Sequence, residues 1–244
     1  MDLIHPGERL DDLQIKGYRI LQDPTAFCFG MDAVLLSGFV RLRPKCRVID
    51  LCTGNGVIPL LLAAKTDAEH IEGLEIQPKM ADMASRSVEL NGLEGRVHIT
   101  TGDVKEASAL FGSSSFDAVT VNPPYMTGGT GLVNPSQAKA VARHEILCTL
   151  EDVVRESSRL LVPGGRFFMV HRPFRLTEII CLMHDWRLEP KRIRFVHSFE
   201  GQEPAMVLVE GIRGANTGVK VERPLVIYDA KDVYSKDVGE IYGK

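Results

Sequence analysis

The feature that most constrains the fold is a strand, a glycine-rich turn and a helix in direct succession. Residues 46–51, Cys-Arg-Val-Ile-Asp-Leu, are typical of a buried strand, and the turn after them contains Gly54 and Gly56. An apolar helix is expected over 57–65. The two glycines permit a tight turn and a close approach of a ligand to the backbone. Position 59 is proline where the dinucleotide fingerprint G-x-G-x-x-G requires glycine, which argues against a nicotinamide dehydrogenase.

Strand and helix patterns alternate through the rest of the chain, and an antiparallel pair of strands closes it. Further strands are predicted at 71–76, 96–100, 117–121, 166–171, 192–197 and 205–210. Helices are predicted at 31–39, 79–91, 105–111, 150–161 and 174–185. This alternation predicts an α/β fold, in which a mostly parallel sheet carries helices on both faces.

The strand at 117–121 ends at a rigid polar corner, Asn122-Pro123-Pro124-Tyr125. The prolines end the strand because neither can donate to a ladder, and they fix the backbone beside Asn122. The Asn122 side-chain oxygen and the Pro123 carbonyl could accept the two N–H bonds of a planar amino group and direct its lone pair at an electrophile. Tyr125 would offer a flat surface for stacking. A strand that merely ends in a Pro-Pro turn is the alternative.

Two acidic residues follow other predicted strands. Glu75 lies twenty-five residues after Asp50, near the offset at which nucleoside-binding units place an acceptor for ribose hydroxyls. Asp103 lies at another carboxyl end, where it could accept from the exocyclic amine of a nucleobase. For Glu75, a neighbour of a helix N-cap is the structural alternative, and both roles are compatible.

A long glycine-rich segment, 126–143, follows the polar corner and is predicted to be a substrate-binding loop. Lys139, Arg143 and His144 close this segment and are candidates for phosphate contacts. Solvation of a helix end explains these three residues equally well.

Composition indicates one globular domain. The chain has 244 residues, 44% hydrophobic and 25% charged, without an apolar run that could span a bilayer or an N-terminal signal-peptide pattern. Five scattered cysteines favour free thiols and a cytoplasmic location over a disulfide or zinc framework, and no metal is expected. The net charge is −3, but residues 155–194 contain nine Lys/Arg and four Asp/Glu, either a local basic face or an ordinary solvated surface.

Taken together, residues 50–56 and 122–125 resemble the motifs of class I S-adenosylmethionine-dependent methyltransferases, in the branch that methylates amino groups. Three further segments, 8–13, 29–36 and 134–145, resemble the tRNA adenine-N6 methyltransferases that modify adenine 37 of a valine tRNA. The resemblance covers residues 8–228 and implies a Rossmann-like, seven-stranded, mostly parallel sheet in the order 3-2-1-4-5-7-6. It implies S-adenosylmethionine as cofactor and tRNA as partner.

The resemblance also implies roles for individual residues. Asn122, Pro123 and Tyr125 would hold the target amine, and Tyr125, Lys139, Arg143 and His144 would bind substrate. The implied cofactor site consists of Phe29, Gly30, Asp50, Cys52, Thr53, Gly54, Gly56, Glu75, Ile76, Asp103, Val104 and Asn122. Phe29 and Gly30 would form a lip near the methyl group, in an N-terminal segment (1–40) that covers this site. Residues 1–228 would form one domain, followed by a charged, loose tail at 229–244.

Three alternatives remain open at this point. The same corner would suit guanine N2 of ribosomal RNA or glutamine N5 of a protein, because each presents a similar NH₂ group. A module that binds the cofactor without catalysis is the alternative from another functional class.

Overall fold

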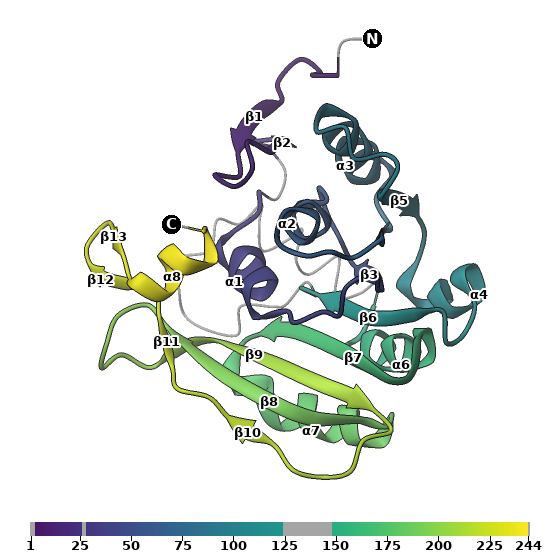
Figure 1. The fold of residues 1–244 in the computed structure, drawn as a ribbon, viewed down its shortest axis with the longest axis vertical. Helices are drawn as coiled ribbons and strands as arrows, with labels where there is room; N and C mark the ends of the chain where they lie inside the picture. Colours follow the sequence, from purple (N-terminus) through teal and green to yellow (C-terminus); the bar gives the residue numbers. More distant parts are fainter. Residues whose placement is uncertain (1–2, 26–27, 124–147, 244) are drawn as a thin grey trace.

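A computed structural model describes residues 3–25, 28–123 and 148–243, and its centre is a mixed β-sheet with helices on both faces (Figure 1). The strands of this sheet are β3 (Arg47–Leu51), β4 (His70–Glu75), β5 (Val97–Thr101), β6 (Phe116–Val121), β7 (Leu161–His171), β8 (Leu188–His197), β9 (Pro204–Arg213), β10 (Lys220–Val221) and β11 (Leu225–Val226). The helices are α1 (Met31–Phe39), α2 (Val57–Lys65), α3 (Pro78–Leu90), α4 (Ala107–Phe111), α6 (Leu150–Leu160), α7 (Leu176–Asp185) and α8 (Lys236–Ile241). The predicted mixed α/β fold is confirmed.

The sheet has the strand order β10-β8-β9-β7-β6-β3-β4-β5, and β11 also pairs with β8. Strands β3 to β7 are mutually parallel, whereas β9 runs antiparallel to both β7 and β8. In the part of the chain that the structure describes, the sheet has nine strands, two more than the seven predicted, because the two-residue strands β10 and β11 attach to the outer strand β8. Strands of this length leave no periodic pattern in a sequence.

Each face of the sheet has its own hydrophobic core. Alternate residues of the central strands, such as Val48 and Ala118, pack with α1, α2 and α3. The intervening residues, such as Ile49 and Val119, pack with α4, α6 and α7. Burial on both faces explains why these strands are nearly continuous apolar runs.

The N-terminal segment forms a hairpin of β1 (Arg9–Asp12) and β2 (Arg19–Gln22), which packs on α3. Arg86 of α3 makes a two-pronged ion pair with Glu8, with both nitrogen–oxygen distances at 2.7 Å. Leu21 N–H donates to Ser87 Oγ at 3.0 Å, and Asn55 of the glycine-rich turn donates to the Leu21 carbonyl at 3.3 Å. The hairpin therefore lies directly beside that turn.

The C-terminal segment is ordered, contrary to the expectation of a loose tail at 229–244. Strand β12 (Tyr228–Ala230) pairs with β13 (Val233–Tyr234), and α8 follows. Val238 of α8 is fully buried, and Ile241 packs so closely on Gly38 of α1 that an added Cβ there would lie 2.7 Å from it. Charged residues dominate the composition of this segment, so the sequence did not indicate the apolar contacts of Val238 and Ile241.

The basic residues of 155–194 do not form one face. Arg155 and Arg159 pair with Glu156 on α6, whereas Arg166 and Arg192 pair with Glu210 inside the sheet region. The remaining cations of the segment lie on β8 and in the segments directly before and after α7: Arg172, Arg175, Arg187, Lys191 and Arg194. Within the described residues, no helix combines the length and the apolar composition that crossing a membrane requires.

Candidate active site

Four parts of the predicted site line one edge of the sheet. The carboxyl ends of β5, β4, β3 and β6 are neighbours in that order, spaced about 4.8 Å apart. They carry Asp103, Glu75, the turn 52–56 and Asn122, respectively. The structure thus brings into one row residues that are scattered over seventy positions of sequence, at the edge where open α/β sheets bind ligands.

The glycine-rich turn after β3 has the conformation that its composition predicts. Cys52, Gly54 and Gly56 all have positive φ, at 56°, 59° and 82°. A Cβ added to Gly56 would meet the Cβ of Ala84 at 3.0 Å, so this glycine lets α2 approach α3. A Cβ added to Gly54 would meet no heavy atom within 4 Å. Gly54 therefore borders open space, as a backbone that admits a ligand must.

Glu75 closes the same turn. Its Oε2 accepts from Gly54 N–H at 2.8 Å, and its Oε1 accepts from Gln77 N–H at 2.9 Å. Oε1 also accepts from Gln77 Nε2 at 3.2 Å, so the remaining acceptor capacity lies on Oε2, and the side chain is only 4% exposed. Glu75 is consequently held in place at the strand end.

Asp50 lies beneath the turn and is fully buried. Its Oδ1 accepts from the Thr120 hydroxyl at 2.6 Å, a contact set by the register in which the two residues pair across β3 and β6. Burial raises the pKa of the Asp50 carboxyl to about 7, against the lowering effect of the Thr120 hydrogen bond. Asp50 therefore supports the turn from below.

Four other predicted cofactor residues differ in burial. Asp103 caps the short 3₁₀ helix that begins at Val104, accepting from Lys105 N–H at 2.9 Å, and its carboxylate is partly exposed. Val104 is buried, whereas Ile76 is partly exposed beside Glu75. Thr53 is buried within the turn.

Phe29 and Gly30 lead into α1 next to the N-terminal hairpin. Phe29 N–H donates to Gln22 Oε1 at 3.0 Å, which ties this segment to β2. A Cβ added to Gly30 would lie 2.9 Å from Asp32 Oδ1. The absence of a side chain at Gly30 thus leaves room for the carboxylate of Asp32.

Asp32 contacts Asn122, and the sequence did not predict this contact. Its Oδ2 accepts from Asn122 Nδ2 at 3.0 Å, and its Oδ1 accepts from Ala33 N–H at 2.9 Å. Because Asp32 engages the amide nitrogen, the Asn122 amide is oriented with its oxygen on the other side. Among the described residues, Asn122 Oδ1 is buried and has no hydrogen-bond partner. Buried polar atoms without a partner are uncommon, and Asn122 Oδ1 shares this state with Asp50 Oδ2, Thr53 Oγ1 and Ser157 Oγ in the described part of the chain. Asn122 Oδ1 is therefore able to accept from a ligand group.

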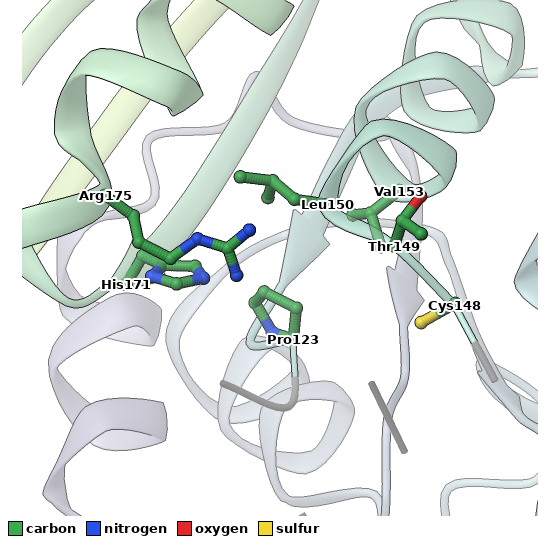
Figure 2. A pocket seen from close by; sticks show the side chains of 7 residues that line it. All are labelled: Pro123, Cys148, Thr149, Leu150, Val153, His171 and Arg175. Carbon is green, nitrogen blue, oxygen red and sulfur yellow. The ribbon is translucent and has the colours of Figure 1, made fainter. Parts of the chain in front are cut away.

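Figure 2 shows a small hollow beside Pro123, between the end of β7 and the start of α6. His171 and Arg175 line one side of it, and Cys148 and Thr149 lie on the other. Its volume of about 10 Å³ admits about one water molecule and excludes a nucleobase. Burial lowers the pKa of His171 to about 4, so its imidazole is neutral at neutral pH.

Four predicted substrate-binding residues, Tyr125, Lys139, Arg143 and His144, lie outside the described residues. Within the described ranges, no group of three or more His, Cys, Asp or Glu side chains is arranged to hold a metal ion.

Comparisons with known proteins agree with this geometry. A protein from Porphyromonas gingivalis (strain ATCC 33277) named tRNA1(Val) (adenine(37)-N6)-methyltransferase is 29% identical over 236 residues, covering 93% of this chain and 91% of its own. A protein of the same name from Aeromonas salmonicida (strain A449) is 29% identical over 221 residues, covering 90% of each chain.

Among solved structures, a protein from Agrobacterium tumefaciens described as a predicted O-methyltransferase has a TM-score of 0.72 and 26% identity. The match covers 87% of this chain and 96% of that one. A 16S rRNA N2 G1207 methyltransferase from T. thermophilus, in complex with AdoMet and guanosine, has a TM-score of 0.60 at 21% identity, covering 86% and 51% of the two chains. At that identity the second match supports the fold.

The family described as methyltransferase small domain matches residues 18–184. This range includes the glycine-rich turn, Glu75, Asp103 and Asn122, and therefore the whole row of residues at the sheet edge. The chain belongs to the methyltransferase small domain family.

Proposed function

We propose that this protein transfers a methyl group from S-adenosylmethionine to the N6 amine of an adenine in tRNA, at an anticodon-loop position of the adenine-37 type. The names of the relatives from Porphyromonas and Aeromonas support the substrate. The orientation of Asn122 supports the chemistry.

The observation that carries the proposal is Asn122 Oδ1, which is buried and has no hydrogen-bond partner among the residues that the structure describes. An exocyclic amine is a weak nucleophile because its lone pair is delocalised into the ring. An NH₂ group has two hydrogens to donate, and the Asn122 oxygen and the Pro123 carbonyl are two acceptors on adjacent residues. Gripping both hydrogens favours a pyramidal nitrogen whose lone pair is available. A hydroxyl has a single hydrogen and would leave one acceptor unmet, which favours N-methylation over O-methylation.

The residues at the sheet edge fit S-adenosylmethionine. Gly54 borders open space for the methionine part, Glu75 retains acceptor capacity on Oε2 for a ribose hydroxyl, and Asp103 presents a partly exposed carboxylate to the adenine amine. Phe29 and Gly30 would contribute the lip near the methyl group. The cofactor supplies an electrophilic methyl group on a sulfonium leaving group. Asn122 and Pro123 then need only hold the acceptor nitrogen in line, and positioning supplies much of the rate.

The target base must leave its stack to reach the corner. Extrusion costs least where the base is unpaired, as in an anticodon loop. We assign Tyr125 to stacking on this base and Lys139, Arg143 and His144 to backbone phosphates. A tRNA substrate also agrees with a cytoplasmic location.

Methyl transfer from labelled S-adenosylmethionine to unmodified total tRNA, followed by nucleoside analysis, tests the proposal. N6-methyladenosine is the expected product. Parallel reactions with ribosomal RNA and with protein extract test guanine N2 and glutamine N5, which present the same NH₂ chemistry. Label in either of these and none in tRNA would overturn the substrate.

The amine-gripping role has its own test in the variant Asn122→Ala. We expect turnover to fall about 100-fold, the loss that misplacement of a reacting group by about 1 Å produces, with cofactor affinity nearly unchanged. Unchanged turnover would refute the role of Asn122.

A further inference from the structure

The active edge of the sheet extends beyond Asn122 to the end of β8. Strand β9 is antiparallel to both β7 and β8, so β7 and β8 are parallel to each other. The carboxyl end of β8, at His197, therefore lies at the same edge as Asn122, which follows β6. Between β6 and β8 lie β7 and β9, so the two ends are three strand spacings apart, about 14 Å.

Four aromatic rings form a continuous series at the end of β8. Ring centroids are 5.5 Å apart for Phe199 and Tyr228, 5.3 Å for Tyr228 and Tyr234, and 6.2 Å for Tyr234 and Tyr242. Tyr228 is fixed to the strand end because its N–H donates to the Ser198 carbonyl at 3.0 Å. Figure 1 shows β12 and β13, which carry Tyr228 and Tyr234, and α8, which directly precedes Tyr242, at the side toward which β6 and β7 run.

Two aromatic side chains on this edge are exposed to solvent. Phe174, three residues after β7 ends, is 63% exposed, and Tyr234 of β13 is 49% exposed. They are the aromatic members of the exposed large hydrophobic residues in the described part of the chain. Phe174 belongs to the 3₁₀ helix Pro173–Arg175, which packs against β9, the strand between β7 and β8. Phe174 thus follows β7, the strand next to β6 and its catalytic corner, whereas Tyr234 belongs to the ring series at the end of β8.

Structural packing accounts for the partly buried rings of the series, which attach β12 and α8 to the sheet. Tyr234 shares in this packing through its contacts with Tyr228 and Tyr242, but about half of its surface stays exposed, and Phe174 is 63% exposed. Residues 219–243 contain four Lys/Arg and five Asp/Glu, so this part of the edge has little charge with which to attract phosphates. A partner here would be held through the planar rings themselves.

We propose that Phe174 and Tyr234 are stacking platforms for unpaired nucleobases of the RNA substrate that flank the methylated adenine. The inference rests on the proposed function. Nucleobases are the occupant that suits exposed, planar side chains, because every base has a π-face and stacking itself needs no charge. Arg172 and Arg175, on either side of Phe174, add positive charge near that ring alone. Extrusion of one base into the corner at Asn122 leaves its neighbours unstacked, and the two rings replace that lost stacking.

The test is the affinity of the full-length protein for a labelled RNA hairpin with a seven-nucleotide unpaired loop, compared with a duplex of equal length. The variants are Phe174→Leu and Tyr234→Leu, which keep apolar bulk and remove the ring. Their matched controls, Phe174→Tyr and Tyr234→Phe, keep the ring, and Val233→Ala alters the exposed neighbour of Tyr234 on β13. Circular dichroism and cofactor affinity establish that each variant is folded.

Each leucine variant is expected to bind the hairpin about 5-fold to 150-fold more weakly, as loss of stacking on one base predicts, while the ring-keeping controls stay within about twofold. Duplex binding should not change. The slope of log Kd against log salt should also stay unchanged, because no phosphate contact is removed.

The outcomes separate this inference from the proposed function. Leucine variants that bind the hairpin as the parent does, while the parent methylates tRNA, would overturn the stacking platforms alone. A parent that methylates no RNA but loses hairpin affinity in the leucine variants would overturn the proposed reaction and keep the platforms. A parent that binds hairpin and duplex equally would overturn the platforms whatever its activity.

Discussion

Removal of the Asp32 carboxylate should impair catalysis by releasing the Asn122 amide. In the structure, Asp32 Oδ2 accepts from Asn122 Nδ2 at 3.0 Å, and the Asp32 side chain is 8% exposed. The bond keeps the amide oxygen directed to the site of the target amine. In the variant Asp32→Ala, the amide can turn so that its NH₂ group faces the substrate and opposes the amine instead of gripping it.

The magnitude follows from the type of bond. A hydrogen bond to a charged group contributes about 1.5–3 kcal/mol. Without this bond, the Asn122 amide populates the flipped orientation more often. If the whole contribution is lost in the transition state, turnover falls about 10-fold to 150-fold. Cofactor affinity should change little, because Asp32 contacts the amide and the start of α1.

The assay is steady-state methyl transfer at saturating cofactor and RNA, so that kcat is measured separately from KM. Ser37→Ala is the matched control, because Ser37 is a buried polar residue of the same helix that donates to the Val34 carbonyl at 2.7 Å. It should lower thermal stability without lowering kcat. Activities are compared well below the unfolding temperature of the least stable variant.

A double-mutant cycle decides between positioning and a general structural effect. If Asp32 acts through Asn122, Asp32→Ala should have almost no further effect on kcat in an Asn122→Ala background. Losses that multiply in the double variant, or a single variant with parental kcat, would refute the reasoning.

Two further predictions concern stability. Burial lowers the pKa of His171 to about 4, against about 6.5 in an unfolded chain. Between these two values the unfolded state binds more protons than the folded state. The free energy of unfolding should therefore fall, by at most about 3 kcal/mol, as the pH is lowered from about 6.5 to about 4. Urea denaturation at pH 7 and pH 5 should show a loss that is smaller in His171→Gln, and equal losses in both proteins would contradict this source. Val238→Ala should destabilise the protein by about 2 kcal/mol, because Val238 is fully buried, and a parental urea midpoint would mean that α8 does not pack in solution.

The central elements could be predicted closely because glycine and proline residues mark their ends. The bounds of α1 and α2 agree with the prediction, since Gly30, Gly56 and Pro44 delimit apolar runs of helical length. Strand β6 was recognisable because prolines follow it directly. The row of site residues was predictable for the same reason, because polar residues that directly follow buried strands must meet at one edge.

The rest depends on contacts between distant residues. Asp32 reads as an ordinary acidic residue in the first turn of a helix, where the helix dipole favours it. Its partner Asn122 is ninety positions away, and no periodicity reports that distance. Strands β10 and β11 likewise exist only because β8 offers an edge, and α8 is defined by its burial on α1.

The contact between Asp32 and Asn122 changes the role of the N-terminal segment. A cover over the cofactor site would contribute binding alone, and its removal would leave the catalytic corner intact. Here α1 carries the carboxylate that orients the catalytic amide, and the hairpin β1–β2 anchors the start of α1 through the bond from Phe29 N–H to Gln22 Oε1. Phe29 and Gly30, the lip expected near the methyl group, precede Asp32 by only three and two residues. If Phe29 and Gly30 form the lip and Asn122 holds the amine, as we propose, the N-terminal residues contribute to both the cofactor site and the orientation of the amide.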